Sequence, residues 1–330
     1  MIVVGATGLV GREMLSILSN ECVPQENVSV AASSKSEGML LSAGRYRDMR
    51  VQALECVDFS KYDVALFSAG SGISKELAPK VVASGCVVID NTSYFRMENC
   101  VPLIIPEVNF ADIEKYSNKK LIANPNCSTI QLVMTLKPLH DAFGVTEVVC
   151  STYQSVSGAG QNGVNELYAQ IDAHFNEQPI APAHFKKQIA FNVIPQIDDF
   201  SNSGYTKEEL KMINETKKIL GIDIDITATC VRVPVMIGHA VSVLAKFEKS
   251  VDIEHAHDVL EKFSGIKITE RLNKNDYATP IDCAGSNDVF VSRLRKHTTL
   301  ENSLSFWCVS DNIRKGAALN AIQIAKRLLK

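Results

Sequence analysis

Short apolar runs alternate with amphipathic segments through the first third of the chain. The apolar runs predict strands at residues 2–4, 28–32, 64–68, 86–90 and 121–123. Residues 11–20 and 75–83 carry their apolar positions at helical spacing. Continuous apolar strands that alternate with helices are typical of a parallel, doubly wound sheet. We therefore expect an α/β domain here.

The pattern changes beyond residue 145, where the apolar runs become longer and several alternate with polar positions. They predict strands at residues 145–153, 227–233, 240–247, 289–294 and 303–309. Helical spacing recurs near residues 163–174, 207–220 and 253–263. This pattern indicates an α+β domain with a largely antiparallel sheet. Residues 314–329 form a last amphipathic helix, which we expect to fold back onto the first domain.

A glycine-rich segment joins the first predicted strand to the first predicted helix. It reads Gly5-Ala6-Thr7-Gly8-Leu9-Val10-Gly11, a G-x-x-G-x-x-G variant of the dinucleotide fingerprint. The glycines permit a tight turn, and the helix N-terminus presents free N–H groups to a pyrophosphate. This context predicts a Rossmann-type domain, and a turn that binds no ligand is the alternative.

The residues after the second predicted strand bear on the choice of nucleotide. NAD-binding domains commonly place a carboxylate there to hold the ribose 2′-hydroxyl group. The sequence instead reads Ser33-Ser34-Lys35-Ser36, with a cation and hydroxyl groups that suit a 2′-phosphate. We therefore expect NADP as the cofactor. The alternative is a solvated polar loop.

Cys127 lies between an apolar strand and an apolar helix, in the sequence Asn124-Pro125-Asn126-Cys127-Ser128-Thr129. A helix N-terminus stabilises a thiolate, which is the nucleophilic form of cysteine. Most cysteines are small core residues, but these polar neighbours make a poor core. The position therefore favours a nucleophile. Beside a nicotinamide cofactor, a thiol suits hydride transfer to or from a thioester, which also requires a proton donor or acceptor.

Among the histidines, His239 has a distinctive setting. It follows Arg232 through a loop that contains proline and glycine, so both side chains can reach one pocket. Alone, either residue would be read as a surface or packing residue. His297 lies in a charged loop. Five other histidines are predicted in helices or at their ends: His140, His174, His184, His255 and His257.

Composition excludes several classes of protein. The chain has 34 basic and 37 acidic residues, and its pI of about 6.2 offers no basic footprint for nucleic acid. No apolar run approaches the ~20 residues that span a bilayer, and no basic segment opens a signal peptide. The nine cysteines are scattered and lack metal-ligand spacing. We expect a cytoplasmic protein with reduced thiols and no metal.

Together these segments resemble the aspartate-semialdehyde dehydrogenase family, in the family's order and along essentially the whole chain. The motifs are GATGLVG at 5–11, DNTSYFR at 90–96, PEVN at 106–109, NPNCST at 124–129, STYQSVSGAG at 151–160, Arg232-Val233-Pro234, Gly238-His239 and Asp311-Asn312. The resemblance implies an NADP-binding domain at 1–126, completed by a C-terminal helix at 312–330. It also implies a catalytic and dimerisation domain at 127–311, and a homodimer.

The resemblance implies a role for individual residues. Cys127 is similar to the family's nucleophile, His239 to its acid/base and Gln154 to the residue that orients the acyl intermediate. For the substrate it implies that Arg232 binds the α-carboxylate, Glu208 the ammonium group, and Arg96 and Lys211 the phosphate, with Asn126 beside them. The implied NADP contacts are Thr7, Gly8, Leu9, Val10, Lys35, Ser36, Ser157, Gly158 and Asn312.

Glu208 and Lys211 also stand one helical turn apart, after Thr206 and Glu209, which form a capping-box pattern. Without the resemblance, a solvated charge pair is the simpler interpretation. Two features depart from the family pattern. Lys35 stands where the family usually has an arginine, and Met1 almost abuts Gly5, so a few preceding residues are expected to be missing.

The implied reaction is the NADPH-dependent conversion of 4-phospho-L-aspartate into L-aspartate 4-semialdehyde and phosphate, in lysine, threonine and methionine biosynthesis. N-acetyl-glutamyl-phosphate reductase is an alternative with similar chemistry, but its acylated substrate amine would not use Glu208. A catalytically inactive NADP-binding homologue is the second alternative. The intact set of Cys127, Gln154, Arg232 and His239 argues against it.

Overall fold

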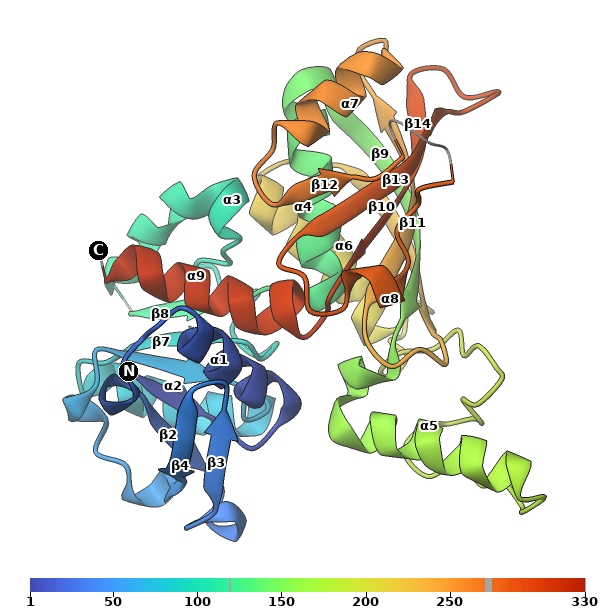
Figure 1. The fold of residues 1–330 in the computed structure, drawn as a ribbon. Coiled ribbons are helices and arrows are strands. Elements are labelled where there is room, and N and C mark those ends of the chain that lie inside the picture. The colour runs from blue at the N-terminus through green and yellow to red at the C-terminus, as the bar shows by residue number, and fades with distance from the viewer. Residues whose placement is uncertain (119, 271–274, 330) are drawn as a thin grey trace. The chain divides into compact units, whose positions relative to one another are not determined.

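The computed structural model describes residues 1–118, 120–270 and 275–329 (Figure 1). The chain folds into two units, Met1–Asn126 with Gly316–Lys330, and Cys127–Lys315. Lys330, the last residue of the predicted C-terminal helix, lies outside the described residues. Each unit has its own sheet and its own buried residues.

The first unit is built on a parallel sheet of six strands in the order β5-β2-β1-β6-β7-β8. The strands are β1 Ile2–Val4, β2 Ser29–Ala32, β5 Gln52–Ala53, β6 Val64–Phe67, β7 Val87–Asp90 and β8 Leu121–Ala123. Numbered in chain order within this sheet, the arrangement is 3-2-1-4-5-6, the order of a dinucleotide-binding domain. The predicted Rossmann-type sheet is confirmed.

Helices cover this sheet. The first unit contains α1 Leu9–Asn20, α2 Ser71–Ala83, α3 Pro106–Asn109 and α9 Leu319–Leu328. α9 packs against β6, β7, α1 and α3 with a face that includes Leu319, Ile322 and Ala325. A π-helical turn, Arg314–Ala318, precedes it. The C-terminal helix thus belongs to the core of the N-terminal sheet, although nearly the whole chain separates them in sequence.

The sequence pattern missed one hairpin in this unit. β3 Leu40–Ala43 and β4 Tyr46–Arg50 form an antiparallel pair. Only Leu41, Tyr46 and Met49 of this hairpin are buried, and they pack into the sheet's core. Four charged residues interrupt the apolar pattern, so the alternation is too weak to read: Arg45, Arg47, Asp48 and Arg50.

The second unit contains another six-stranded sheet, in the order β10-β9-β11-β14-β13-β12. Its strands are β9 Val145–Gln154, β10 Asp225–Arg232, β11 His239–Phe247, β12 Ile266–Ile268, β13 Val289–Lys296 and β14 Ser303–Ser310. The three inner pairings are antiparallel, and the two outer ones are parallel. The prediction of an α+β domain is confirmed. The sheet is mixed because its two edge strands, β10 and β12, run parallel to their neighbours.

Helices line one face of this second sheet. They are α4 Cys127–Phe143, α6 Lys207–Leu220 and α7 Ile253–Glu261 (Figure 1). α4 lies beneath the centre, where it packs on β9, β11, β13 and β14 and is buried along most of its length. Two further helices are α5 Gly160–Phe175 and the short α8 Pro280–Cys283.

A long segment between α5 and α6, residues 176–206, contains no named helix or strand. His184 lies within it. The prediction that His184 belongs to a helix or its end is therefore wrong, because α5 ends at Phe175. In the described part of the chain, no helix has the length and apolar character needed to cross a membrane.

Candidate active site

Three strands of the second sheet bring Gln154, Arg232 and His239 to one end of the sheet. Gln154 ends β9 and pairs with Arg232, the last residue of β10, on one side. On the other side it pairs with His239, the first residue of β11. Residues in register on neighbouring strands point to the same face, and all three side chains are buried. The strand register alone therefore assembles an amide, a guanidinium and an imidazole.

Gly158 marks the point where the Arg232 and His239 side chains converge. A Cβ atom at residue 158 would lie 2.8 Å from both Arg232 Nη1 and His239 Nε2. Any side chain there would displace both polar atoms. The absence of a side chain at Gly158 thus keeps the two groups close together.

Cys127 is the first residue of α4 and is partly exposed, whereas Ser128, Thr129 and Ile130 behind it are buried. The dipole and first-turn N–H groups of this helix stabilise negative charge at its start. At the buried cysteines, by contrast, burial disfavours the negatively charged thiolate. It raises the pKa to about 11 at Cys86, and to about 12 at Cys150, Cys283 and Cys308. These buried thiols stay protonated near pH 7.

Arg232 is a buried cation with few partners of opposite charge. Its side chain is 5% exposed, and its Nη1 donates a hydrogen bond to the Ser155 carbonyl oxygen at 2.7 Å. The Phe185 ring lies 6.0 Å from its guanidinium carbon. Burial lowers the pKa of Arg232, while negative charge at Glu208 and Cys127 opposes the shift. Cys127 thus lies within electrostatic range of a largely desolvated guanidinium.

His239 is held in one tautomer by its surroundings. Its Nδ1 accepts a hydrogen bond from the backbone N–H of Ser155 at 3.0 Å. A backbone N–H can only donate, so the ring proton must sit on Nε2. Among the described residues, Nε2 has no hydrogen-bond partner, although it is buried. Burial and, secondarily, the charge of Arg232 lower the pKa of His239 to about 3, so the ring is neutral near pH 7.

α6 adds a carboxylate and an ammonium group to this end of the sheet. The predicted capping box is present, with Thr206 and Glu209 bonded reciprocally. Glu208 follows the cap and is 5% exposed, and its Oε1 accepts a hydrogen bond from Gln154 Nε2 at 3.1 Å. Its Oε2 lies 3.1 Å from Lys211 Nζ. The interpretation as a solvated charge pair is therefore wrong for Glu208, which faces the sheet.

Lys211 bridges two carboxylates. Its ammonium group lies 2.9 Å from Asp198 Oδ2 as well as 3.1 Å from Glu208. Burial lowers the pKa of Lys211, but these carboxylates outweigh burial and the net shift is upward. Lys211 is thus a charged lysine whose present partners are anionic oxygens. A phosphate oxygen has the same character.

Asn312 organises the loops around His239. Its Oδ1 accepts hydrogen bonds from the Gly238 N–H at 2.8 Å and the Ser155 hydroxyl at 3.1 Å. Its Nδ2 lies 3.0 Å from the Ser157 hydroxyl oxygen. The side chain is buried. Asn312 therefore connects the segment before β11 with the segment after β9.

A cavity of about 180 Å³ opens beside Arg232. Its lining comes from the segment between α5 and α6, the residue before α5 and the end of β10: Ala159, His184, Phe185, Lys186, Ile194, Gln196, Ile197, Asp198, Asp199 and Arg232. The volume suits a small molecule of a few heavy atoms. Its walls carry both signs of charge, as a small zwitterion requires.

The glycine-rich loop lies in the first unit, between β1 and α1. Gly5 has a φ of +84°, and a Cβ atom at Gly11 would lie 2.3 Å from the Gly5 carbonyl oxygen. Gly8 precedes the first turn of α1, and no side chain caps this helix. Its first N–H groups are thus presented by Leu9 and Val10, as a pyrophosphate site requires. This geometry fits a dinucleotide.

The remaining predicted cofactor and phosphate residues of the first unit lie in the segments that follow β2, β7 and β8. Lys35 and Ser36 belong to a 3-10 turn, Ser34–Ser36, after β2, and Lys35 is exposed. Arg96 is buried and its Nη2 donates to the Asn91 carbonyl oxygen at 2.9 Å. Asn126, also buried, follows β8. In the described ranges, no group of three His, Cys, Asp or Glu residues is arranged to hold a metal ion.

Two family models match the chain. Residues 1–116 match "Semialdehyde dehydrogenase, NAD binding domain", and residues 136–315 match "Semialdehyde dehydrogenase, dimerisation domain". A curated aspartate-semialdehyde dehydrogenase from Aquifex aeolicus is 46% identical over 99% of this chain and 97% of its own length. The chain belongs to the aspartate-semialdehyde dehydrogenase family.

Solved structures of aspartate-semialdehyde dehydrogenases share the whole fold. The Vibrio cholerae enzyme II, complexed with ASA, superposes with a TM-score of 0.96 at 44% identity, covering 99% of this chain and 97% of the other. The Candida albicans enzyme with NADP gives a TM-score of 0.77 at 25% identity, covering 99% and 97%. Membership of this family makes the chain an oxidoreductase with a nicotinamide-nucleotide domain.

Sequence reasoning missed several polar and aromatic residues of the second unit's site. Ser155 orients His239, Asp198 binds Lys211, and Phe185 faces Arg232. Ser155 lies inside the motif that carries the family resemblance, so the motif could have indicated it. Asp198 and Phe185 lie in the segment without helix or strand, where no periodicity indicates which side chains point inward.

Proposed function

We propose that this chain reduces 4-phospho-L-aspartate to L-aspartate 4-semialdehyde with NADPH, through a thioester on Cys127. The observation that carries the proposal is the register that aligns Gln154, Arg232 and His239 at the sheet end, within electrostatic range of Cys127. A nucleophile, an N–H donor and a buried cation beside a small cavity suit an acyl-transfer and reduction site on an anionic substrate.

Cys127 is the proposed nucleophile of this reaction. The Cys127 thiolate attacks the acyl carbon, the carbon–oxygen bond to phosphate breaks, and phosphate leaves with the electron pair. Bound NADPH supplies the hydride that reduces the thioester. Collapse of the resulting hemithioacetal then breaks the carbon–sulfur bond and restores the thiolate. His239 Nε2–H donates a hydrogen bond to the substrate oxygen while that oxygen carries negative charge.

Substrate recognition is assigned to Arg232 and Glu208. The planar guanidinium matches the two oxygens of an α-carboxylate, and its burial removes competing water. Glu208 provides a buried carboxylate for the free ammonium group, and Asn126 is proposed beside the phosphate. An acylated amine carries no positive charge, so a buried Glu208 favours aspartyl phosphate over the N-acetyl-glutamyl phosphate alternative.

Lys211 and Arg96 are the proposed phosphate ligands. The partners of Lys211 support this assignment, because its ammonium group already contacts the anionic oxygens of Asp198 and Glu208. Phosphate would have to replace Asp198 in this arrangement. Arg96 contributes a buried guanidinium in the first unit.

The two cation sites of the second unit are separable by mutation. Arg232→Lys should raise the KM for aspartate semialdehyde by about a hundredfold, because a point charge replaces a bidentate fork, while the KM for phosphate stays near its normal value. Lys211→Ala should raise the KM for phosphate about tenfold in the reverse reaction and affect semialdehyde less. Steady-state kinetics that vary each ligand in turn give both values. An exchanged pattern would exchange the two assignments.

NADP is proposed in preference to NAD because Lys35 and Ser36 follow β2 where an NAD enzyme has a carboxylate. Lys35→Ala should raise the KM for NADP about tenfold, since a charge-assisted contact to phosphate is worth roughly 1.5–3 kcal/mol. The KM for NAD should change less than twofold. The matched control is Lys61→Ala, an exposed lysine at the end of the turn Phe59–Lys61 of the same unit. An equal rise for NADP and NAD would refute the role of Lys35.

The same proposal includes a homodimer and a place in lysine, threonine and methionine biosynthesis. The matched family model is described as a dimerisation domain. The face of the second sheet opposite α4 exposes Val149 and Tyr153, which offers an apolar surface to a second copy. The nine cysteines are all free, which favours the cytoplasm.

A spectrophotometric assay tests the reaction directly. The purified chain should reduce NADP at 340 nm when L-aspartate 4-semialdehyde and phosphate are both present, and arsenate should replace phosphate. N-acetyl-glutamate semialdehyde serves as the competing substrate. Activity only with the acetylated substrate would support the reductase alternative, and NADP binding without turnover of either would support an inactive homologue.

A further inference from the structure

The segment between α5 and α6 forms one wall of the Arg232 cavity without any regular secondary structure. The Phe185 ring faces the guanidinium at 6.0 Å. Further along, the backbone of Ile194 exchanges two hydrogen bonds with the backbone of Arg232, at 2.9 and 2.8 Å. The position of Arg232 therefore depends on a segment that forms no helix or strand of its own, so its other backbone groups need partners in side chains or loops.

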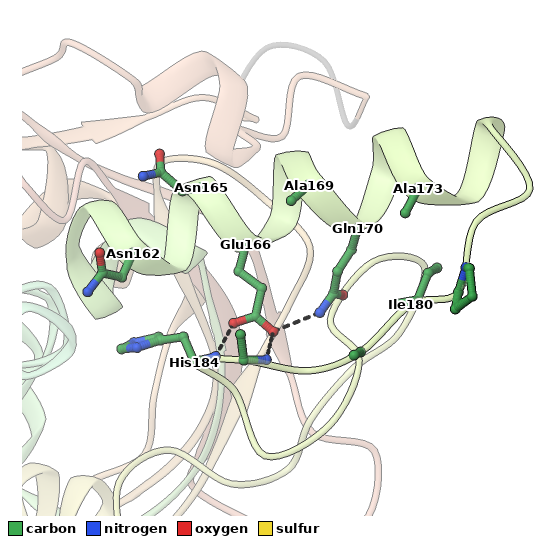
Figure 2. Close-up of a pocket in the computed structure, with 11 residues that line it drawn as sticks. Asn162, Asn165, Glu166, Ala169, Gln170, Ala173, Ile180 and His184 are labelled. Atoms are coloured by element: carbon green, nitrogen blue, oxygen red, sulfur yellow. Dashed lines mark hydrogen bonds between the residues drawn. The ribbon is translucent and has the colours of Figure 1, made fainter.

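Two side chains of α5 supply those partners. Glu166 is buried, and its carboxylate accepts hydrogen bonds from the backbone N–H groups of Ala183, His184 and Phe185. Figure 2 shows this carboxylate reaching from the helix to the backbone beside His184. A carboxylate that accepts several N–H bonds forms strong, charge-assisted contacts. Glu166 thus fixes the backbone on which Phe185 stands.

Gln170, one turn later on α5, repeats the arrangement. Its Oε1 accepts from the backbone N–H groups of Ile189 and Ala190, at 2.8 and 3.0 Å. Its Nε2 donates to Glu166 Oε1 at 2.7 Å, as Figure 2 shows. The two side chains are therefore one hydrogen-bonded unit. Together they hold the backbone at residues 183–185 and 189–190, and His184 and Phe185 of the first stretch line the Arg232 cavity.

Packing joins this polar pair to Arg232. Phe185 and Met236 pack against a small buried cluster that includes Val156, Leu167 and Ile189. Gly163 on α5 leaves room for the ring, because a Cβ atom there would lie 3.1 Å from Phe185 Cζ. Moving the ring out of this cluster would cost these packing contacts.

We propose that Glu166, supported by Gln170, is a positioning residue for the substrate-carboxylate site: it holds Phe185 and thereby the guanidinium of Arg232. Glu166 does not line the Arg232 cavity itself. It acts on the geometry of a buried arginine whose Nη1 donates to a carbonyl oxygen and whose guanidinium faces an aromatic ring. The inference rests on the proposed role of Arg232 in binding the α-carboxylate.

Glu166→Gln tests this role with little change in size. The amide NH₂ would face backbone N–H groups, and two of the donors would lose their acceptor. The KM for aspartate semialdehyde should rise about tenfold with kcat within twofold, because binding of ground and transition states is weakened alike. The KM values for phosphate and NADP should stay within twofold. The matched control is Asn165→Ala, which removes a contact to Gln161 on the same helix and should change no KM.

Phe185→Leu keeps the apolar packing but removes the ring face, and should raise the same KM. The Glu166→Gln/Phe185→Leu double variant should be no worse than the poorer single variant, because both act through one ring. Multiplicative effects, or equal rises for all three ligands, would overturn the proposal. If the wild-type chain fails to turn over aspartate semialdehyde at all, the proposed function fails instead.

Discussion

Replacing Cys127 with serine should lower kcat by at least four orders of magnitude in both directions, because serine lacks a thiolate and no other group beside it can form the thioester. Serine preserves the size of the side chain and the start of α4. The affinity for NADP should remain within twofold. Initial rates and a fluorescence titration with NADPH measure the two quantities.

The other cysteines provide the control for this experiment. Cys22, Cys56 and Cys100 are exposed, so their replacement tests whether a general loss of surface thiols matters. A triple variant of these residues should keep full activity. A second measurement addresses the covalent step. With 4-phospho-L-aspartate and no NADPH, mass spectrometry should detect an aspartyl adduct on the wild-type chain and none on Cys127→Ser. Activity of the serine variant above one per cent would refute a thioester on this residue.

The elements could be predicted because their apolar periodicity is local. β1, β8 and α6 begin and end where the pattern places them, and α1 begins two residues before it. The order of the strands could not be read in this way, since pairing joins distant segments. The first sheet's parallel arrangement followed from the fingerprint and the α/β pattern, but the order of its strands did not. The mixed second sheet did not, because nothing in the strand Asp225–Arg232 itself shows that its neighbour runs parallel.

The residues of the candidate site likewise differ in whether the local sequence could predict them. Cys127 could be predicted from its neighbours, since a strand, a polar turn and an apolar helix define its position. The family resemblance implied a role for Glu208, but the local pattern could not, because the capping box places it on a helix without showing which face is buried. Only the packing of α6 against β10, secured by Glu209 Oε1 accepting from the Cys230 N–H at 2.9 Å, turns Glu208 toward Gln154.

The sequence pattern could not predict the role of residues that act through the segment between α5 and α6. Glu166 and Gln170 have the spacing of an ordinary helical i, i+4 pair. Their shared function becomes visible only when five backbone N–H groups of an irregular segment are found on them. The lowered pKa and the tautomer of His239 could not be predicted from the sequence either, because both depend on how the folded chain buries the ring.

The family resemblance implies an acid/base role for His239. The environment of the ring favours one part of that role, the donation of a hydrogen bond. A ring whose Nδ1 accepts the Ser155 N–H and whose pKa is lowered to about 3 is a neutral donor through Nε2. It does not gain or lose a proton between pH 5 and 8 in the free enzyme. The pH profile of kcat/KM should therefore show no step attributable to His239 in that range.

The sign of the effect on stability follows from the same pKa. The folded-state pKa lies below the ordinary value of 6.5, so between about pH 3 and 6.5 the unfolded chain binds the additional proton. The stability that this neutral ring contributes is complete above pH 6.5 and is lost as the pH falls through the window, by roughly 1.4 kcal/mol per pH unit. Urea unfolding at pH 7 and pH 5 should show a smaller difference for His239→Gln than for the wild type.

Activity of His239 variants separates a hydrogen-bond donor from a titrating base. His239→Ala should lower kcat about a thousandfold, since one donor to a developing oxyanion is worth 10²–10³. His239→Gln offers an amide N–H in nearly the same place, so its kcat should be at least ten times that of His239→Ala. Ser303→Ala, at the far end of β14 from His239, is a control for general damage to the sheet, and its kcat should be unchanged. Equal losses for alanine and glutamine, together with a kcat/KM step near pH 6.5 that disappears in both variants, would show that His239 works by gaining and releasing a proton. Partial activity in glutamine alone, with a flat profile, fits a ring that keeps its Nε2 proton and aims it at the substrate oxygen.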